Sequence, residues 1–222
     1  MGAKMKLYHG TTEVSLEKLL VNGISPRGDK STNWKDYPSR VDMVYLTQSY
    51  ALYFAIQATQ NTDKERILII EVDSNKLNQT KFFPDEDFLA QEINDLSKHD
   101  EFRDNLVQYK NRWKDSLSKI GNVAYKGIVH PYSFSRYCLI DVKKHAEVAM
   151  MGLDPTISIM NYKFVGFKYR NLIAWLFGDS DSLVTSEEVE MYKQLPNMEQ
   201  WLENWDRLSK DRSGIEIVNM AK

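Results

Sequence analysis

The feature that most constrains the fold is a short stretch near the start of the chain, Leu7-Tyr8-His9-Gly10-Thr11-Thr12. Residues of strand character lead into a His-Gly pair, and hydroxyl residues follow where a helix should begin. Gly10 has no Cβ, so the backbone can pass close to another group at that point. His9 brings a ring nitrogen to the same place. A histidine alone is more often an ordinary hydrogen-bonded residue than a functional one, so the stretch needs support from elsewhere in the chain.

A second stretch supplies that support: Val44-Tyr45-Leu46-Thr47-Gln48-Ser49-Tyr50-Ala51-Leu52-Tyr53-Phe54-Ala55. It predicts a short buried strand followed by a helix that a hydroxyl residue caps. Small residues occupy one face of this helix and tyrosines another. Tyr45 at the strand end and Tyr53 on the helix are therefore expected to face one crevice. The alternative is that both tyrosines are core residues with satisfied hydroxyls.

Together the two stretches resemble the NAD-binding half of the diphtheria-toxin-like and poly(ADP-ribose)-polymerase-like ADP-ribosyltransferases. The resemblance covers about residues 6–145. It implies an α+β fold of the ADP-ribosyltransferase type, with a split β-sheet core that carries inserted helices; a C-terminal helical extension is expected to follow this core. It also implies NAD as the co-substrate.

The resemblance assigns roles to individual residues. His9 would hydrogen-bond the ribose hydroxyls on the adenine side, while the backbone of Gly10 would bind the nicotinamide amide and Thr11 would add to the cofactor site. Tyr45 and Tyr53 would hold the nicotinamide ring between them. One further residue, Arg27 in the loop that follows, would contact the cofactor, unless it is a solvated loop arginine.

The glutamate of the resembling families is missing from its usual place. It normally sits at the head of a late strand, but residues 121–140 include no acidic side chain. Glu86 is the first candidate to reach the site from elsewhere, ahead of Asp85 and Glu71, although acidic residues also suit the start of a helix without any catalysis. A second group of candidates, in the late strands themselves, is Tyr125, Lys126 and Arg136. In a further alternative the pocket binds NAD without turning it over.

The rest of the chain is organised by hydrophobic patterning. Residues 67–72 form the most apolar run and predict a strand in the middle of a sheet. Residues 100–120 are charged and amphipathic and predict an inserted helical segment. Two late strands are predicted at 123–129 and 137–142.

We expect residues 1–148 to form the catalytic domain and residues 149–222 to form a helical extension packed on it. The last predicted helix has an apolar stripe that includes Trp201 and Trp205. A partner-binding helix pair is the alternative for this extension.

Composition narrows the functional class further. The net charge of −2 gives no global attraction to nucleic acid, which would need a local basic patch. The single cysteine, Cys138, excludes an internal disulfide and a cysteine-based zinc site. No run approaches the length of a membrane span and no signal peptide is seen, so no membrane contact and a cytoplasmic location are expected, and no metal site is predicted.

The sequence therefore predicts a mono-ADP-ribosyltransferase that cleaves the bond between nicotinamide and ribose and transfers ADP-ribose to a nucleic acid or protein acceptor. A bacterial toxin or anti-phage defence effector is the expected role, with an antitoxin or inhibitor as partner. Two alternatives stay open. One is a catalytically silent NAD-binding or nucleotide-binding module of the same fold, and the other is an enzyme like the RNA 2′-phosphotransferases, which share the His-Gly-Thr opening.

Overall fold

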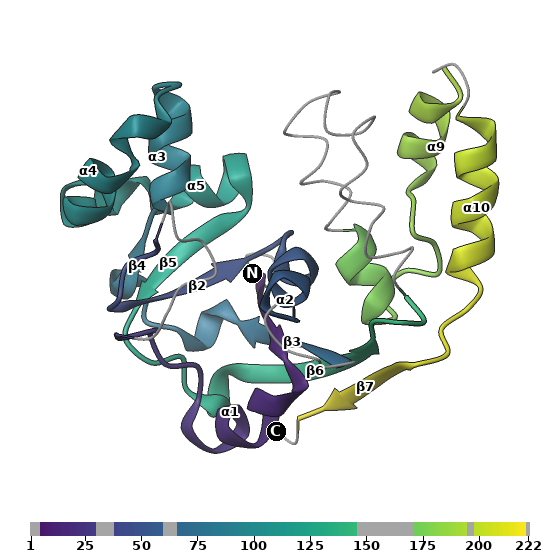
Figure 1. Cartoon of the computed structure of the whole chain (residues 1–222), viewed down its shortest axis with the longest axis horizontal. Helices are drawn as coiled ribbons and strands as arrows, with labels where there is room; N and C mark the ends of the chain where they lie inside the picture. Colours follow the sequence, from purple (N-terminus) through teal and green to yellow (C-terminus); the bar gives the residue numbers. More distant parts are fainter. Residues whose placement is uncertain (1–4, 30–37, 60–65, 146–170, 195–197, 221–222) are drawn as a thin grey trace.

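The described part of the chain, residues 5–29, 38–59, 66–145, 171–194 and 198–220, forms one open seven-stranded sheet in this computed structural model. The strand order is β4-β5-β2-β1-β3-β6-β7, and every neighbouring pair is antiparallel. The strands are β1 (Lys6–Thr12), β2 (Met43–Thr47), β3 (Arg66–Asp73), β4 (Phe82–Phe83), β5 (Asn122–Lys126), β6 (Phe134–Asp141) and β7 (Ile215–Asn219). Helices lie at both ends of the sheet and over it (Figure 1), so the predicted mixture of helix and strand is confirmed.

The middle of the sheet is built on β3, as its apolar run predicts. Seven of its eight residues are buried, because β1 and β6 pair with its two edges. The charged residue inside this strand, between the terminal residues Arg66 and Asp73, is Glu71. It lies opposite Arg136 of β6 and receives hydrogen bonds of 2.7 and 3.0 Å from its guanidinium. Glu71 is thus the partner of a neighbouring strand, which leaves it no part in the cavity described below.

The two central strands β1 and β2 separate almost as soon as they meet. β1 pairs with β3 through seven residues, and β2 pairs with β5 through five. Between β1 and β2 the register has a single pair, Tyr8 opposite Thr47. The sheet therefore opens between these strands, next to His9 and Tyr45.

Helices cover the sheet on both faces. On one face α2 (Ala51–Thr59) and α10 (Glu199–Ser209) pack with the helical residues 171–176, and on the other face α1 (Leu16–Asn22) packs against the sheet. Thr47 accepts hydrogen bonds from the N–H groups of Ser49 and Tyr50 just before α2 begins, which is the predicted capping role of a hydroxyl residue. Short 3-10 turns complete the path of the chain: Glu13–Ser15, Ser74–Lys76, Gln79–Lys81, Leu96–Lys98, Leu106–Arg112 and Pro131–Ser133.

The inserted segment at the β4–β5 end of the sheet is more broken than predicted. It contains α3 (Glu86–Glu92), α4 (His99–Asp104) and α5 (Trp113–Ile120), which gather in one corner of the molecule (Figure 1). The inserted helical segment predicted over 100–120 is confirmed as helical, but it is interrupted, because α4 ends at Asp104 with Asn105 as its C-cap. The side-chain amide of Asn105 donates to the carbonyl of Glu101, and such local bonds compete with helix continuation.

The C-terminal segment is not purely helical. It provides α9 (Ser186–Tyr192) and α10, but then β7, which pairs with β6 from Ile140↔Ile215 to Arg136↔Asn219. The prediction of a helical extension is therefore corrected at residues 215–219, where β-branched side chains favour a strand. The boundary at 148/149 lies among residues outside the described part and stays a prediction.

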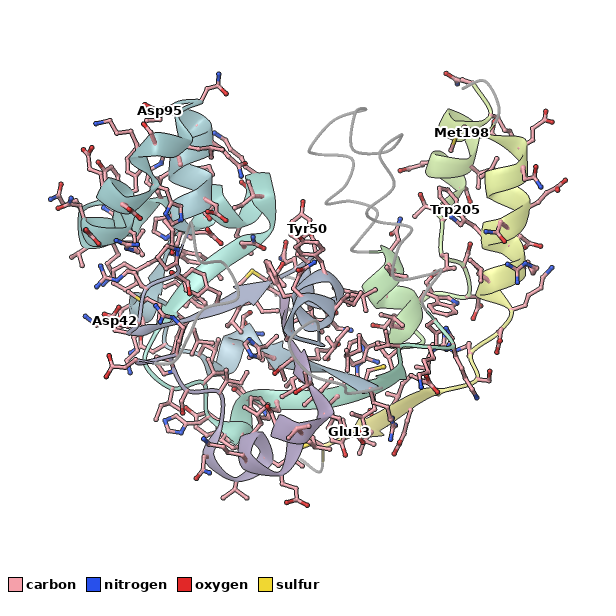
Figure 2. All side chains as sticks on the ribbon, in the orientation of Figure 1. Glu13, Asp42, Tyr50, Asp95, Met198 and Trp205 are labelled. Carbon is pink, nitrogen blue, oxygen red and sulfur yellow. The ribbon has the colours of Figure 1, made fainter. Side chains whose placement is uncertain are left out.

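The apolar stripe of α10 is used inside the molecule. Met198 and Trp205 are buried on the inner side of this helix, in the same cluster as α2 (Figure 2). Trp205 thus belongs to the core and is not exposed for binding a partner, as the alternative interpretation of this helix required. The side chain of Trp201 lies outside the described part. None of the helices in the described ranges combines the length and apolar character that crossing a bilayer requires.

The contact between β1 and α2 explains why a glycine stands at position 10. A Cβ built on Gly10 would lie 1.8 Å from the carbonyl oxygen of Ala51 and 3.0 Å from the backbone nitrogen of Ala55. The glycine therefore makes room for the first turn of a helix. The small residues at the helix positions that meet β1 serve the same close approach, since both alanines are fully buried.

We expect the substitution Gly10→Ala to lower the free energy of unfolding by about 3 kcal/mol, the upper end of the usual cost of overpacking. The physical reason is that the added methyl group meets backbone atoms, which cannot rotate away. The matched control is Gly28→Ala, where nothing lies within 4 Å of the added Cβ and only the positive φ of 61° opposes it, at a cost of about 1 kcal/mol. Urea unfolding measures both variants, and equal losses would contradict this account of Gly10.

Candidate functional site

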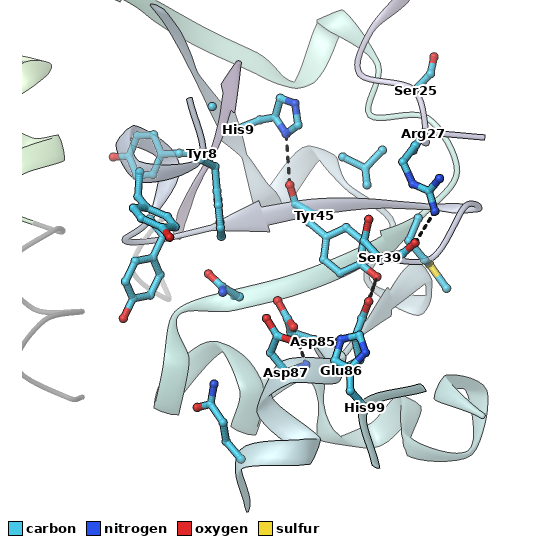
Figure 3. A pocket seen from close by; sticks show the side chains of 18 of the residues that line it. Tyr8, His9, Ser25, Arg27, Ser39, Tyr45, Asp85, Glu86, Asp87 and His99 are labelled. Carbon is cyan, nitrogen blue, oxygen red and sulfur yellow. Dashed lines mark hydrogen bonds and ion pairs between the residues drawn. The ribbon is translucent and has the colours of Figure 1, made fainter. Parts of the chain in front are cut away.

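A cavity of about 640 Å³ lies where β1 and β2 separate. Four parts of the chain contribute its walls: the β1–β2 region, the start of α2, the inserted segment from Asp85 to His99, and Asn122 at the start of β5 (Figure 3). Its lining is formed by Tyr8, His9, Gly10, Ser25, Arg27, Ser39, Met43, Val44, Tyr45, Tyr50, Tyr53, Phe54, Asp85, Glu86, Asp87, Gln91, Leu96, His99 and Asn122.

His9 is held in one protonation state by its surroundings. Its Nδ1 lies 3.2 Å from the carbonyl oxygen of Tyr45, and because a carbonyl only accepts, Nδ1 must carry the proton. Burial lowers the pKa of His9, which favours the neutral ring. The remaining nitrogen, Nε2, therefore carries a lone pair that can accept a hydrogen bond.

Tyr45 and Glu86 meet across the cavity. The phenolic oxygen of Tyr45 lies 2.5 and 2.7 Å from the two carboxyl oxygens of Glu86, and it also accepts the N–H of Arg40 at 3.1 Å. Burial, followed by the charge of Glu86, raises the pKa of Tyr45 well above its usual value. Tyr45 is thus a neutral donor that orients the Glu86 carboxyl (Figure 3).

The inserted segment is joined to β5 through one buried hydroxyl. The N–H of Asp85 donates to Oγ of Ser116 at 3.0 Å, and Ser116 donates onward to the carbonyl of Asn122 at 2.8 Å. Asp85 is also the N-cap of α3, where its carboxyl accepts the N–H of Asp87 at 2.9 Å. The side chain of Asn122 is a further hydrogen-bond partner of the Asp85 carboxyl. These bonds place residues 85, 86 and 122 side by side on the cavity floor.

The carboxyl groups on this floor are costly to ionise. Burial raises the pKa of Asp85 well above its usual value, and it raises the pKa of Glu86 as well. Asp87 is different, because its side chain is 55 % exposed and lies 3.1 Å from Nε2 of His99. The hydrogen bond to Asp87 raises the pKa of His99, so Asp87 favours the protonated form of this ring.

The structure brings together most of the residues that the sequence singled out. His9, Gly10, Arg27, Tyr45, Tyr53 and Glu86 all line the one cavity. Thr11 is not among the residues that line it, and its part in cofactor binding stays a prediction. Arg27 donates from Nη2 to the carbonyl of Ser39 at 2.6 Å, which fixes it on the cavity wall. Three other candidates for the acidic position, Tyr125, Lys126 and Arg136, lie outside the lining.

Sequence reasoning missed Asn122 and His99. Asn122 stands at the head of β5, the position at which the resembling families carry a glutamate. Its side chain is an amide, so the expectation of an acidic residue did not point to it. His99 had no signal of its own, because its place in the cavity depends on the break between α3 and α4. Among the described residues, no group of three acidic, histidine or cysteine side chains is placed to hold a metal ion.

Comparison with known proteins gives little. No protein-family model matches the sequence, and no curated protein matches it. Among solved structures the chain is similar to EcPltA, with 9% sequence identity and a TM-score of 0.38, over 63% of this chain and 78% of that chain. A likeness of this size carries no functional conclusion, so the proposals below depend on the cavity itself.

We expect Asp85→Asn to raise the melting temperature at pH 8 by roughly 2–4 °C, the shift that about 1 kcal/mol produces in a chain of this size. Asn still caps α3, whereas the buried carboxyl is removed. Because the pKa of Asp85 is raised by folding, the folded wild type loses stability as the pH rises from the unfolded pKa through the folded one. The gain should therefore vanish near pH 4. Asp95→Asn, at the N-cap of a 3-10 turn, is the control, and a lower melting temperature for Asp85→Asn at pH 8 would contradict this account.

Proposed function

We propose that the protein is an NAD-dependent mono-ADP-ribosyltransferase and that the cavity between β1, β2 and α3 is its active site. The observation that carries this proposal is the convergence of His9, Tyr45 and Glu86, from three separate segments, on one cavity. A volume of about 640 Å³ lies within the usual range of cofactor pockets. The opening of the sheet between β1 and β2 is, in this proposal, the split of the transferase core.

In this mechanism NAD is held and strained by the first two strands. Nε2 of His9 accepts a hydrogen bond from a ribose hydroxyl, and the backbone of Gly10 binds the nicotinamide amide. The tyrosines on the wall, Tyr45 and Tyr53, hold the leaving ring. Such positioning lowers the barrier by fixing a reactive geometry before the bond breaks.

The reaction breaks the bond between the ribose C1′ and the nicotinamide nitrogen. The electron pair of that bond leaves with neutral nicotinamide, and positive charge develops on the ribose ring, as in glycoside hydrolysis. The carboxylate of Glu86 would stabilise this positive charge. A nearby cation in turn favours the ionised form of a buried carboxyl. The hydroxyl of Tyr45 orients the carboxyl of Glu86 by hydrogen bonding to it.

One observation favours a second candidate function. The head of β5 carries Asn122, which cannot ionise, and the carboxyl of Glu86 is already engaged by Tyr45. A module of this fold that binds NAD and does not turn it over would have these features. The phosphotransferase alternative gains no such support, since Arg27 is the only lysine or arginine among the described residues that line the cavity.

The biological role follows only from the proposed activity. A protein or nucleic acid would be the acceptor, and a toxin or defence effector acting in the cytoplasm, with an inhibitor protein as partner, is the proposed setting.

We expect the purified protein to release nicotinamide from NAD and His9→Ala to slow that release by roughly 100-fold, the cost of misplacing a bound substrate by about 1 Å. His130→Ala is the matched control, because His130 is exposed and outside the cavity. Chromatography of free nicotinamide measures turnover, and calorimetry measures NAD binding. Full turnover in His9→Ala would overturn the site, whereas NAD binding without release from the wild type would select the silent module.

A further inference from the structure

The hydroxyl of Tyr45 is held from two sides. It accepts a hydrogen bond from the backbone N–H of Arg40 at 3.1 Å, and it lies 2.5 and 2.7 Å from the two carboxyl oxygens of Glu86 (Figure 3). The accepted N–H occupies a lone pair of the phenolic oxygen, so the phenolic proton is left for the carboxyl. The position of the backbone at Arg40 therefore affects how Tyr45 and Glu86 are aligned.

The segment that carries Arg40 is fastened to helix α4 by two arginines. The guanidinium of Arg40 donates to the backbone carbonyl of Arg103 at 2.8 Å, and the guanidinium of Arg103 donates to the backbone carbonyl of Pro38 at 3.4 Å. Each side chain thus binds the backbone of the other segment. The last carbonyls of a helix have no partner within the helix, and a cation is favourable beside them. We use the name arginine clasp for the side chains of Arg40 and Arg103.

Asp42 fixes the direction of the Arg40 side chain. Nε of Arg40 lies 2.8 Å from Oδ1 of Asp42, and Nη2 lies 3.2 Å from Oδ2. Two parallel bonds of this kind hold a guanidinium in one plane. The hydrogen bond from Arg40 lowers the pKa of Asp42, so the carboxyl stays ionised. A lysine has one nitrogen at its tip and cannot bind both carboxyl oxygens and the carbonyl of Arg103 in the same geometry.

Arg40 reaches the candidate site through another residue. It is not one of the described residues that line the cavity, whereas Tyr45 and Glu86 both line it. Its hydrogen bond to the Tyr45 hydroxyl connects it to the lining. A change at Arg40 is therefore expected to alter the alignment of Tyr45 and Glu86 and to leave the contacts of bound NAD largely in place.

We infer that the arginine clasp positions the Tyr45–Glu86 pair for the reaction, and that Arg40 is a positioning residue of the active site. This inference rests on the proposed transferase function and adds a residue to it. The clasp holds the backbone N–H of Arg40 against the phenolic oxygen. The hydroxyl then keeps the Glu86 carboxyl in the orientation in which it stabilises the charge on the ribose.

Nicotinamide release from NAD by the full-length protein tests the clasp. We expect Arg40→Ala to lower kcat by roughly tenfold or more, the factor that follows from losing one hydrogen bond of a charged group, with little change in the KM for NAD. Arg40→Lys keeps the charge but not the fork, and it should lower kcat as well. Arg66→Ala is the matched control, because Arg66 also bridges two segments, through Glu13 and Glu216, and should leave kcat unaltered.

A double-variant cycle separates positioning from a general effect on the fold. In Tyr45→Phe the hydroxyl is absent, so adding Arg40→Ala should cause almost no further loss of kcat. If the two losses multiply instead, or if Arg40→Ala and Arg40→Lys keep the full kcat, the inference is overturned while the transferase function stands. Urea unfolding checks that each variant is folded, and Arg40→Lys decides the matter if Arg40→Ala is not.

A second measurement applies if the wild type releases no nicotinamide. In that case the transferase function fails, and the clasp is judged from the titration of Glu86 by NMR of protein with labelled glutamate carboxyl groups, assigned with Glu86→Gln. Burial raises the pKa of Glu86 and the hydrogen bond from Tyr45 lowers it, so a weaker bond in Arg40→Ala should raise this pKa further. The same titration in Arg40→Ala and the wild type, or an equal change in Arg66→Ala, overturns the clasp.

Discussion

The separation of β1 from β2 is the constraint on which the cavity depends. Two neighbouring strands normally satisfy each other's backbone groups along their length, but here the register has a single pair. The carbonyl of Tyr45 is left without a strand partner on that side, and the ring of His9 takes the place of the missing backbone donor. A side chain thus completes the sheet, and in doing so it becomes fixed toward the opening.

The buried carboxyl groups on the floor of the cavity lower the stability of the folded protein. Carboxyl groups that are buried without a cation oppose folding above their unfolded pKa. An asparagine in place of Asp85 would cap helix α3 equally well. Such strain is commonly kept where a ligand relieves it. The hydroxyl of Tyr45 and the amide of Asn122 hold the groups in place without neutralising them.

Much of the sheet could be predicted because its strands carry strong local signals, above all the apolar run of β3 and the His-Gly end of β1. The inserted segment was predicted less well, since the amphipathic pattern over 100–120 is continuous while a single side chain, Asn105, ends α4. For the site, the residues on β1 and β2 were predictable from position. Glu86 was one of several candidates, and Asn122 was not foreseen, because its importance comes from a three-dimensional contact with Asp85 that no local pattern encodes.

The hydroxyl of Ser116 has a consequence for how this pocket can respond to what enters it. This hydroxyl donates its proton to the carbonyl of Asn122 and accepts the N–H of Asp85. The side chain is fully buried. The start of α3 and the head of β5 are therefore joined through one buried hydroxyl. Moving either of them alone would break a buried hydrogen bond, which costs about 1–3 kcal/mol, so a ligand that displaces one is opposed by the other.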